Sequence, residues 1–296
     1  MTHFQHTTVM RTEVIQALAP RDGAIYVDCT VGAGGHAEGL LEAASGATVL
    51  GIDRDPSALA ASAERLARFG DRVQLVRGNF ADVGKVLESR GIRRVDGLVA
   101  DLGVSSPQVD DAARGMSFRH AGPLDMRMDP DAPLTALDLV AQCTDDELAE
   151  IIYRFGDERR SRRIARSVRR AYSEGNLLTT MDLRRAIVRA VGPARVGGVD
   201  PATRTFQALR VAVNGELDAL EGLLGTLASI LNPGAMVAML SFHSLEDRPI
   251  KHTFAIRDVW EPLWKKPKMA SDEESFDNPR ARSAKLRVAR WLGELG

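Results

Sequence analysis

The chain has 296 residues, of which 44% are hydrophobic, and it carries a formal net charge of −1 at pH 7. This length accommodates one large domain or two, with enough apolar content for an ordinary core. The polar N-terminus and the lack of any run of about 20 apolar residues argue against a signal peptide and a membrane span. Cys29 and Cys143 form no metal or disulfide pattern, which suits a cytoplasmic protein without a metal site.

The first third of the chain alternates between predicted strands and predicted helices. A short amphipathic helix is expected over 8–18, before a turn at 20–23. Buried strands are then predicted at 24–28, 47–53, 73–76 and 95–101, with helices at 37–44, 55–69 and 83–88. Asp55 can cap the second of these helices, and Pro56 suits its first turn. This alternation predicts an α/β fold with a mostly parallel sheet and right-handed crossovers.

A glycine-rich turn follows the first predicted strand. Gly32, Gly34 and Gly35 lie between that strand and the next helix, and such a turn lets a ligand approach the main chain closely. Ala37 stands where the dinucleotide fingerprint would have its last glycine, so the loop is not the standard form of that motif. Taken alone, the loop fits either a nucleotide-type cofactor site or a tight turn without a ligand.

Three predicted strands end in a carboxylate, namely Asp28, Asp53 and Asp101. Ligands of open α/β sheets bind beyond the carboxyl ends of the strands, so these side chains should converge on one crevice with the glycine turn. An acidic residue in the position of Asp53 typically accepts hydrogen bonds from ribose hydroxyls. Phe80, just past the third strand, can pack against an adenine face. Asp101 opens the small, polar loop 101–108, where a substrate would meet the cofactor.

From residue 109 the pattern changes to a turn-rich link followed by helices. Helices are predicted at 135–140, 144–155, 161–172 and 180–191, and capping boxes are expected at Thr144 and, more weakly, Thr180. We interpret 109–203 as a helical insertion domain, flanked by a discontinuous α/β domain over 1–108 and 204–296.

Arginines are concentrated in this insertion. Residues 151–210 contain 14 Arg, no Lys and 5 acidic residues, a net charge of +9, whereas the rest of the chain carries −10. Such a patch on an otherwise acidic protein is typical of a partner rich in phosphate, although a solvated helix face with salt bridges would also explain it. The cluster comprises Arg159, Arg160, Arg162, Arg163, Arg166, Arg169 and Arg170.

The α/β pattern resumes after the insertion. A long helix over 206–230, with a possible break at Gly215, precedes a turn at 232–234 and a strand at 235–240. The segment 241–248 follows that strand and brings His243, Glu246 and Asp247 to the carboxyl edge of the sheet. We expect 260–277 to be mobile and 283–290 to form the closing strand.

Eight motifs make the chain resemble a known family. They are FQHTTVM at 4–10, GAGGH at 32–36, IDRDP at 52–56, DLGVSSPQ at 101–108, GPLDMRMDP at 122–130, PATRTFQALR at 201–210, SFHSLEDR at 241–248 and NPRARS at 278–283. Together they resemble the bacterial small-subunit rRNA cytosine-N4 methyltransferases of the RsmH (MraW) type over nearly the whole chain. The resemblance implies a class I fold, S-adenosylmethionine as the cofactor, and methylation of a cytidine N4 amino group in the decoding region of 16S rRNA, within the small ribosomal subunit.

The resemblance also implies a set of site residues. By motif position, the cofactor contacts fall on Gly34, Gly35, His36, Asp53, Phe80, Asp101 and Gln108. The arginine-rich segment, rather than the motifs, leads us to expect RNA contacts at Arg159, Arg162, Arg163, Arg166 and Arg204. Three positions depart from the family pattern. Asp200 replaces a usual His, Met116 replaces a usual Phe, and Pro249 replaces a common aliphatic residue. We expect Pro249 to end the helix there. Asp200 removes a possible positive charge near the predicted RNA face. If this chain differs from its family, we therefore expect the difference in its affinity for the substrate.

The chemistry suggests which groups could activate the substrate. The lone pair of a cytosine amino group is delocalised into the ring, and an acceptor for its hydrogens would localise that lone pair. Asp101 and its loop, with Ser105, are the first candidates, and His243 or Asp247 the second. A nicotinamide-dependent dehydrogenase and a non-catalytic rRNA-binding assembly factor remain alternatives. The sequence does not decide between a monomer and a homodimer.

Overall fold

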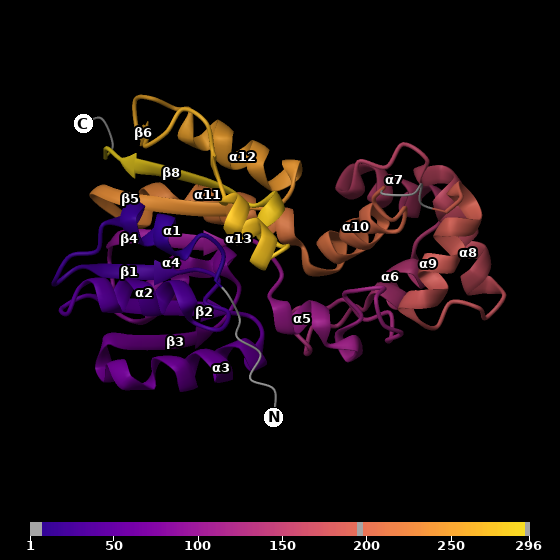
Figure 1. The fold of residues 1–296 in the computed structure, drawn as a ribbon, viewed down its shortest axis with the longest axis horizontal. Helices are drawn as coiled ribbons and strands as arrows, with labels where there is room; N and C mark the ends of the chain where they lie inside the picture. The colour runs from indigo at the N-terminus through magenta and orange to yellow at the C-terminus, as the bar shows by residue number, and fades with distance from the viewer. Residues whose placement is uncertain (1–7, 194–197, 294–296) are drawn as a thin grey trace. The chain divides into compact units, whose positions relative to one another are not determined.

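The computed structural model describes residues 8–193 and 198–293. The chain divides into two compact units (Figure 1). The first contains the residues up to Gly103 and those from Leu217 onward, and the second is Val104–Glu216. The predicted insertion, 109–203, falls inside the second unit. Within the described ranges, no helix has the length and apolar character needed to cross a membrane.

The first unit is built on one sheet. Its strands are β1 Ile25–Asp28, β2 Thr48–Asp53, β3 Val73–Arg77, β4 Val95–Asp101, β5 Leu231–Ser241, β6 Trp260–Pro262, β7 Lys268–Met269 and β8 Lys285–Trp291. Their order is β3-β2-β1-β4-β5-β8-β6, with β7 also paired to β8. The first five strands pair in parallel, whereas β8 runs antiparallel to β5. The mostly parallel sheet and the closing strand were both predicted correctly.

Helices cover both faces of this sheet (Figure 1). One face packs against α1 Arg11–Leu18, α2 Gly35–Ala43 and α3 Pro56–Leu66. The other packs against α4 Val83–Ser89, α11 Glu216–Ile230 and α12 Ser244–Phe254. Successive side chains of a strand point to opposite faces, so in β4 Leu98 and Ala100 belong to one core and Val99 to the other.

The second unit is helical and has its own apolar core. Its helices are α5 Ser106–Asp110, α6 Ala136–Gln142, α7 Asp145–Gly156, α8 Ser161–Ser173, α9 Thr180–Val191 and α10 Thr203–Asn214. Helix α8 buries Ile164, Ala165 and Val168 in this core. Asn214 fastens the turn-rich link to α10, because its side chain donates to the Met126 carbonyl at 2.8 Å and accepts from the Met128 amide at 2.7 Å.

Several local signals in the sequence are confirmed. The Asp55 carboxylate accepts from the Ser57 amide at 3.0 Å, and Pro56 is the first residue of α3. Thr144 forms the predicted capping box at the start of α7. The long helix after the insertion is broken at Gly215, whose φ of +58° favours glycine.

Three local predictions were wrong in detail. The capping box of α9 belongs to Thr179, one residue before the predicted Thr180. Residues 232–234 form no separate turn but lie within β5, where the register shifts between Val95 and Gly97 and Gly234 has φ +85°. Pro249 does not end α12, which continues to Phe254. Burial of Ile250 and Phe254 in the core offsets the one hydrogen bond that Pro249 removes.

The segment 260–277 was expected to be mobile but contains regular structure. Strands β6 and β7 both pair with β8, and α13 Asp272–Asp277 is capped by Ser271. The Trp260 ring lies between those of Phe254 and Trp291, with centroids 5.1 and 4.9 Å away. Strands this short carry almost no periodic pattern, so the sequence signal for them was weak.

Candidate active site and RNA-binding face

The carboxyl ends of three adjacent strands carry the acidic residues that the sequence indicated. Asp28, Asp53 and Asp101 end β1, β2 and β4, and β1 lies between the other two strands. The loop after β1 joins them, because the Gly32 amide donates to Asp53 Oδ2 at 2.9 Å and the Asp101 amide donates to Thr30 Oγ1 at 2.7 Å. The predicted convergence of these carboxylates with the glycine turn is therefore present in the first unit.

Asp28 is the most deeply buried member of this group. Its side chain is fully inaccessible, and Oδ1 accepts from the Thr30 amide at 3.2 Å. Among the described residues, no group hydrogen-bonds to Oδ2 at ordinary distance and angle, although the Ala37 amide is close enough to lower the pKa of this carboxyl. Burial raises the pKa of Asp28 to about 7, and the nearby charges of Asp101 and Asp53 add to the shift. Asp28 was not among the predicted contacts, although its place at a strand end was a usable signal.

Asp101 resembles Asp28 electrostatically but is more accessible. Burial raises its pKa to about 7, opposed by the hydrogen bond from the Gly103 amide at 3.2 Å and aided by the charge of Glu246. Burial also raises the pKa of Asp53, although the Asp55 and Gly32 amides both donate to its carboxylate. This edge of the sheet therefore disfavours negative charge and would gain from a cation.

The glycines of the turn are required for two different reasons: a positive φ at Gly32 and Gly34, and a lack of space for a Cβ at Gly35. Gly32 has φ +51°, and a Cβ there would meet only the Thr30 carbonyl, at 3.8 Å, so the space beside it is open. Gly34 has φ +83° at the start of α2. At Gly35 a Cβ would lie 1.7 Å from Thr8 Oγ1, so the N-terminal segment occupies that space.

The other predicted cofactor contacts of the first unit lie nearby in sequence and fold. His36 is buried, and its Nε2 lies 3.0 Å from the Val9 carbonyl. Phe80 begins a short 3-10 helix after β3 and packs partly against the core. The Arg54 guanidinium lies 6.0 Å from its ring centroid. Gly35 and His36 are buried, so packing is one reason for these residue types. Gly32, Asp53 and Phe80 are partly exposed to solvent.

The segment after β5 brings one histidine and two carboxylates to the same edge. His243 Nε2 lies 3.0 Å from Glu246 Oε1, and Glu246 Oε2 accepts from the Phe242 amide at 2.8 Å. Asp247 instead receives two hydrogen bonds from Arg287, at 2.7 and 3.2 Å. Burial opposes the charge on Asp247, but these bonds outweigh it and lower its pKa. Asp247 is thus committed to an ion pair, whereas the charge of Glu246 acts on Asp101 and His243 contacts Glu246.

Ser105 and Gln108 lie in the second unit. The Ser105 amide donates to Gln108 Oε1 at 3.1 Å, and Gln108 is largely buried. The predicted substrate loop, 101–108, therefore begins in the first unit and ends at the start of α5.

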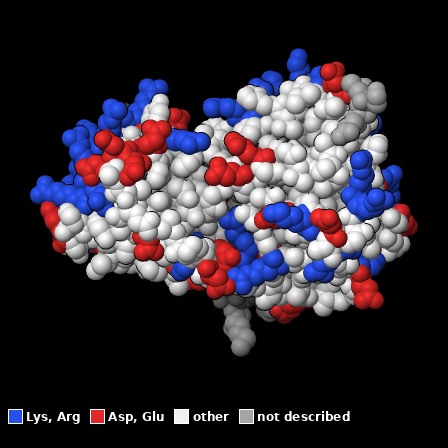
Figure 2. All heavy atoms as spheres, turned by 180° about the vertical axis from the view of Figure 1, so that it is seen from behind, with Lys and Arg blue, Asp and Glu red and all other residues white. Residues whose placement is uncertain are grey.

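The clustered arginines of the second unit divide into a set without a carboxylate partner and a set held by intramolecular contacts. In Figure 2 basic side chains gather along the edge at the left of the view, which belongs to this unit. Arg159, Arg162, Arg163 and Arg166 are exposed. Within 8–193 and 198–293 no carboxylate pairs with any of these four. Their excess charge is not neutralised locally, as a phosphate-binding face requires.

The remaining arginines of the cluster make intramolecular contacts. Arg169 donates to the carbonyls of Val140 and Ala141, at 2.8 and 3.2 Å. Arg160 pairs with Glu158 at 3.6 Å and Arg170 with Glu174 at 2.7 Å. Arg204 is exposed, and its Nη1 donates to the Asp157 carbonyl at 3.0 Å. This division was not predictable, because all seven clustered arginines look alike in sequence.

Asp200 also has a structural role. Its Oδ2 accepts from Arg184 Nε and Nη2 at 3.0 and 2.8 Å, and Oδ1 accepts from the Ala202 amide at 2.9 Å. Met116, another departure from the family pattern, is buried. The carboxylate of Asp200 thus fixes α9 to the residues before α10.

The residues at the strand ends fit S-adenosylmethionine, which carries a sulfonium and an ammonium group. The unpaired, buried Oδ2 of Asp28 and the raised pKa values of Asp28 and Asp101 favour a cationic ligand. Asp53 and Phe80 offer a carboxylate and an aromatic face for the nucleoside. Strand β8, antiparallel between β5 and β6, distinguishes this sheet from the dinucleotide-binding order 3-2-1-4-5-6. Fold and site together define a class I methyltransferase that uses S-adenosylmethionine.

Comparison with known proteins assigns the family. The family model described as the MraW methylase family matches residues 3–292, and the chain belongs to this family. It is 59% identical over 289 residues to the Ribosomal RNA small subunit methyltransferase H of Sorangium cellulosum, covering 98% of this chain and 91% of that protein. The protein of the same name from Synechococcus elongatus is 49% identical, with coverage of 97% and 94%.

Solved structures resemble the chain more distantly. An rRNA methylase from Streptococcus thermophilus aligns with a TM-score of 0.44 and 9% identity, covering 95% of this chain and 93% of that one. A SAM-dependent O-methyltransferase from Thermotoga maritima aligns with a TM-score of 0.45 and 10% identity, covering 99% and 70%. The class therefore rests on the sheet order, the strand-end residues and the family match rather than on these alignments.

Proposed function

We propose that this protein transfers a methyl group from S-adenosylmethionine to the N4 amino group of a cytidine in the decoding region of 16S rRNA, within the small ribosomal subunit. The observation that carries the proposal is the set of strand-end carboxylates, whose electrostatics favour a cationic cofactor, in a chain of this family. The names of its relatives support the small-subunit rRNA as substrate. Such a substrate implies a cytoplasmic enzyme.

The proposed cofactor contacts are Gly32, Asp53, Phe80 and Asp101, with Gly34, Gly35, His36 and Gln108 retained from the family motifs, while the fully buried Asp28 acts through its charge. Asp53 would accept from ribose hydroxyls while its backbone donors hold it in place. When bound, S-adenosylmethionine supplies an electrophilic methyl group on a sulfonium. The carboxylates of Asp28 and Asp101 stabilise positive charge at this edge of the sheet.

Asp101 is the proposed acceptor for the cytosine amino group. Its pKa of about 7 means that a substantial fraction is ionised near neutral pH and still basic enough to take a proton. Accepting an N–H hydrogen localises the nitrogen lone pair, and the proton lost from nitrogen after transfer passes to the same carboxylate. Glu246, whose charge acts on Asp101, and His243, which lies 3.0 Å from Glu246, are the proposed route for passing that proton onward. Asp247 ranks lower, since it is held by Arg287, while Ser105 stays a candidate with the Asp101 loop.

Replacing Asp101 tests this assignment. Asp101→Ala and Asp101→Asn should lower the single-turnover rate of tritiated-methyl transfer to unmethylated small subunits by about 10²–10⁴-fold, the usual contribution of a general base. In the wild type the rate should rise with pH through about 7 and level off, following ionisation of Asp101, and both variants should lose this rise. Calorimetry with S-adenosylmethionine separates a loss of binding from a loss of chemistry.

The matched control is Asp96→Asn. Asp96 lies on the same strand, where its carboxylate accepts from the Ile25 amide at 2.9 Å and pairs with Arg21. Because this residue lies at the opposite end of β4, the variant should retain the wild-type rate and pH profile. Near-normal transfer by both Asp101 variants would reject the role of Asp101.

The exposed arginines of α8 are the proposed phosphate contacts, together with Arg159 and Arg204. Reversing Arg162, Arg163 and Arg166 to Glu should weaken binding to small-subunit rRNA. It should also reduce the slope of log affinity against log salt by about 2, at about 0.7 per single-strand phosphate contact. Unchanged affinity and slope would show that this face is merely solvated.

The two alternatives can be distinguished by experiment. A nicotinamide-dependent dehydrogenase is disfavoured by the family match and by the antiparallel β8. A non-catalytic assembly factor would bind rRNA and the cofactor but leave the methylation of small subunits from a deletion strain unchanged. Methyl incorporation on adding the purified protein contradicts that alternative. Gel filtration with light scattering decides between monomer and homodimer.

A further inference from the structure

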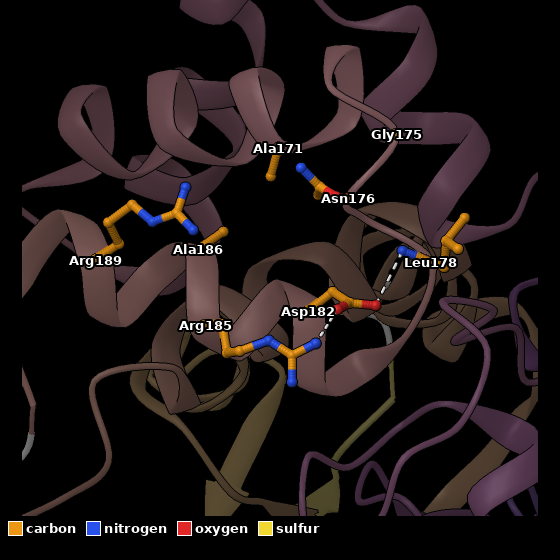
Figure 3. A pocket seen from close by; sticks show the side chains of 8 residues that line it. All are labelled: Ala171, Gly175, Asn176, Leu178, Asp182, Arg185, Ala186 and Arg189. Atoms are coloured by element: carbon orange, nitrogen blue, oxygen red, sulfur yellow. Dashed lines mark hydrogen bonds and ion pairs between the residues drawn. The ribbon is translucent and has the colours of Figure 1, made fainter.

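A cavity of about 400 Å³ lies between α8, the loop after it, and α9. Figure 3 shows Ala171 and Asn176 on the α8 side and Arg185, Ala186 and Arg189 on the α9 side. Leu178, at the rim, leaves 66% of its surface exposed. The volume falls within the range of small-ligand sites, so it can hold one nucleotide of a longer chain.

The charges that line the cavity are positive in excess. Arg185 and Arg189 lie one turn apart on α9 and are both exposed. Arg189 makes no hydrogen bond or ion pair with any residue in the described ranges, although its charge acts on Glu174. Two carboxylates are close by: Asp182, which pairs with Arg185, and Glu174, which pairs with Arg170 at 2.7 Å.

Neither carboxylate is free to neutralise Arg189. Asp182 Oδ2 accepts from the Leu178 and Thr179 amides, at 3.2 and 2.8 Å, because it closes the capping box of α9. Glu174 is engaged by Arg170 and by the Asn176 side chain. The unused guanidinium of Arg189 and the remaining donors of Arg185 therefore favour an added anion, and two arginines can hold it with several N–H groups.

The walls of the cavity are also fixed before any ligand binds. The Asn176 amide donates to the Ala171 carbonyl at 2.8 Å, and Gly175 turns the chain with φ +71°. Leu177, next to the exposed Leu178, is buried in the core of the unit. A rigid loop keeps Leu178 at the rim, so an apolar contact there costs little ordering entropy.

We propose that this cavity binds one nucleotide of the RNA substrate, with its phosphodiester on Arg185 and Arg189 and its base or sugar against Leu178. The inference rests on the proposed function, because RNA is the phosphate-rich partner that function supplies. The site is distinct from the exposed face of Arg159, Arg162, Arg163 and Arg166. The arginine face offers only charged contacts, whereas this cavity also offers an apolar contact through Leu178.

The test is fluorescence anisotropy of the full chain with a labelled single-stranded RNA at several salt concentrations. The double variant Arg185→Ala/Arg189→Ala should bind more weakly and lower the log–log salt slope by about 0.7, because the two arginines share one phosphate. Leu178→Ser should weaken binding without changing the slope, because it removes only an apolar contact. Inorganic phosphate should compete with RNA for the wild type more than for the double variant.

The matched control is Arg90→Ala/Arg93→Ala. Both arginines are exposed and lie in the first unit, just after α4, so the change in net charge is the same. This control should retain the slope, and thermal unfolding should show that every variant is folded, since the exposed Arg185–Asp182 pair contributes little.

Three results would overturn the proposal. The first is equal slopes and affinities for the double variant and its control. The second is 4-thiouridine crosslinking that attaches no RNA to 175–189 in the wild type. The third is an acidic peptide that depends on Arg185 and Arg189 for binding while RNA does not. Methyl transfer at saturating RNA is measured separately: if the wild type binds RNA through this cavity yet transfers no methyl group, the proposed function fails and the cavity assignment stands.

Discussion

The buried carboxylate of Asp28 makes the stability of the protein without its cofactor depend on pH in a defined direction. Its pKa in the folded protein is about 7, above the ordinary value of 3.8. The folded state therefore holds the proton more tightly than the unfolded chain does. The stabilisation this provides is fully present below pH 3.8 and is lost as the pH rises to about 7.

The size of the effect follows from the shift. One pKa unit corresponds to about 1.4 kcal/mol, so the whole shift corresponds to at most about 4 kcal/mol. Between pH 5 and pH 8 the part that changes is about 2.5 kcal/mol. Asp28→Asn has nearly the same shape and no charge to bury. Its free energy of unfolding, relative to that of the wild type, should rise by about this amount over that interval.

Urea unfolding of both proteins at pH 5 and pH 8, without cofactor, measures this difference. Asp101 titrates in the same range and its charge acts on Asp28, so the comparison is repeated in an Asp101→Asn background, where only Asp28 differs. Adding S-adenosylmethionine at pH 8 should narrow the gap, because a cationic ligand stabilises the ionised Asp28. A gap that is the same at both pH values would refute the assignment of a raised pKa to Asp28.

Three further predictions follow from individual contacts. Gly35→Ala should destabilise the protein by about 1–3 kcal/mol, as overpacking does, since its Cβ would meet Thr8; thermal unfolding that matches the wild type would contradict this contact. Arg287→Met should cost about 1.5–3 kcal/mol in urea unfolding, because the half-buried Asp247 loses its main partner and keeps only Lys285 at 3.6 Å; the loss should shrink as the pH falls below 3.8 and Asp247 becomes protonated. Asp200→Asn keeps the side-chain oxygen that accepts from the Ala202 amide but loses the charge, so it should lower the free energy of unfolding by about 1 kcal/mol. An unchanged midpoint of unfolding would count against the ion pair with Arg184.

Features encoded by neighbouring residues were predictable from the sequence. The caps at Asp55 and Thr144 and the break at Gly215 depend on side chains within a few residues, so composition and spacing sufficed. The parallel sheet followed from the alternation of strands and helices, and the placement of Asp28, Asp53 and Asp101 followed from that sheet.

Features that depend on distant contacts were not predictable. Nothing local indicates that Thr8 occupies the space beside Gly35, or that Arg287 pairs with Asp247, because these partners lie far apart in the chain. The continuation of α12 through Pro249 likewise depends on burial of Phe254 in the core. The raised pKa of Asp28 is a consequence of burial, which a strand-end position alone does not reveal.

The difference between Asp200 and the family pattern illustrates the same limit. In sequence it was a lost positive charge on an RNA face, with an expected effect on substrate affinity. In the structure its carboxylate binds Arg184 and the start of α10. The effect of Asp200 on stability therefore follows from its bonds with Arg184 and Ala202, whereas its effect on RNA affinity remains a prediction.

Methylation of cytidine N4 in small-subunit rRNA is tested by mass mapping of that RNA. Small subunits from a strain that lacks this protein are incubated with the purified chain and S-adenosylmethionine, and the rRNA is digested and sequenced by mass. We expect one cytidine in the decoding region to gain a single methyl group at N4, and Asp101→Asn to abolish this gain. No added methyl group, or one on another base or atom, would contradict it.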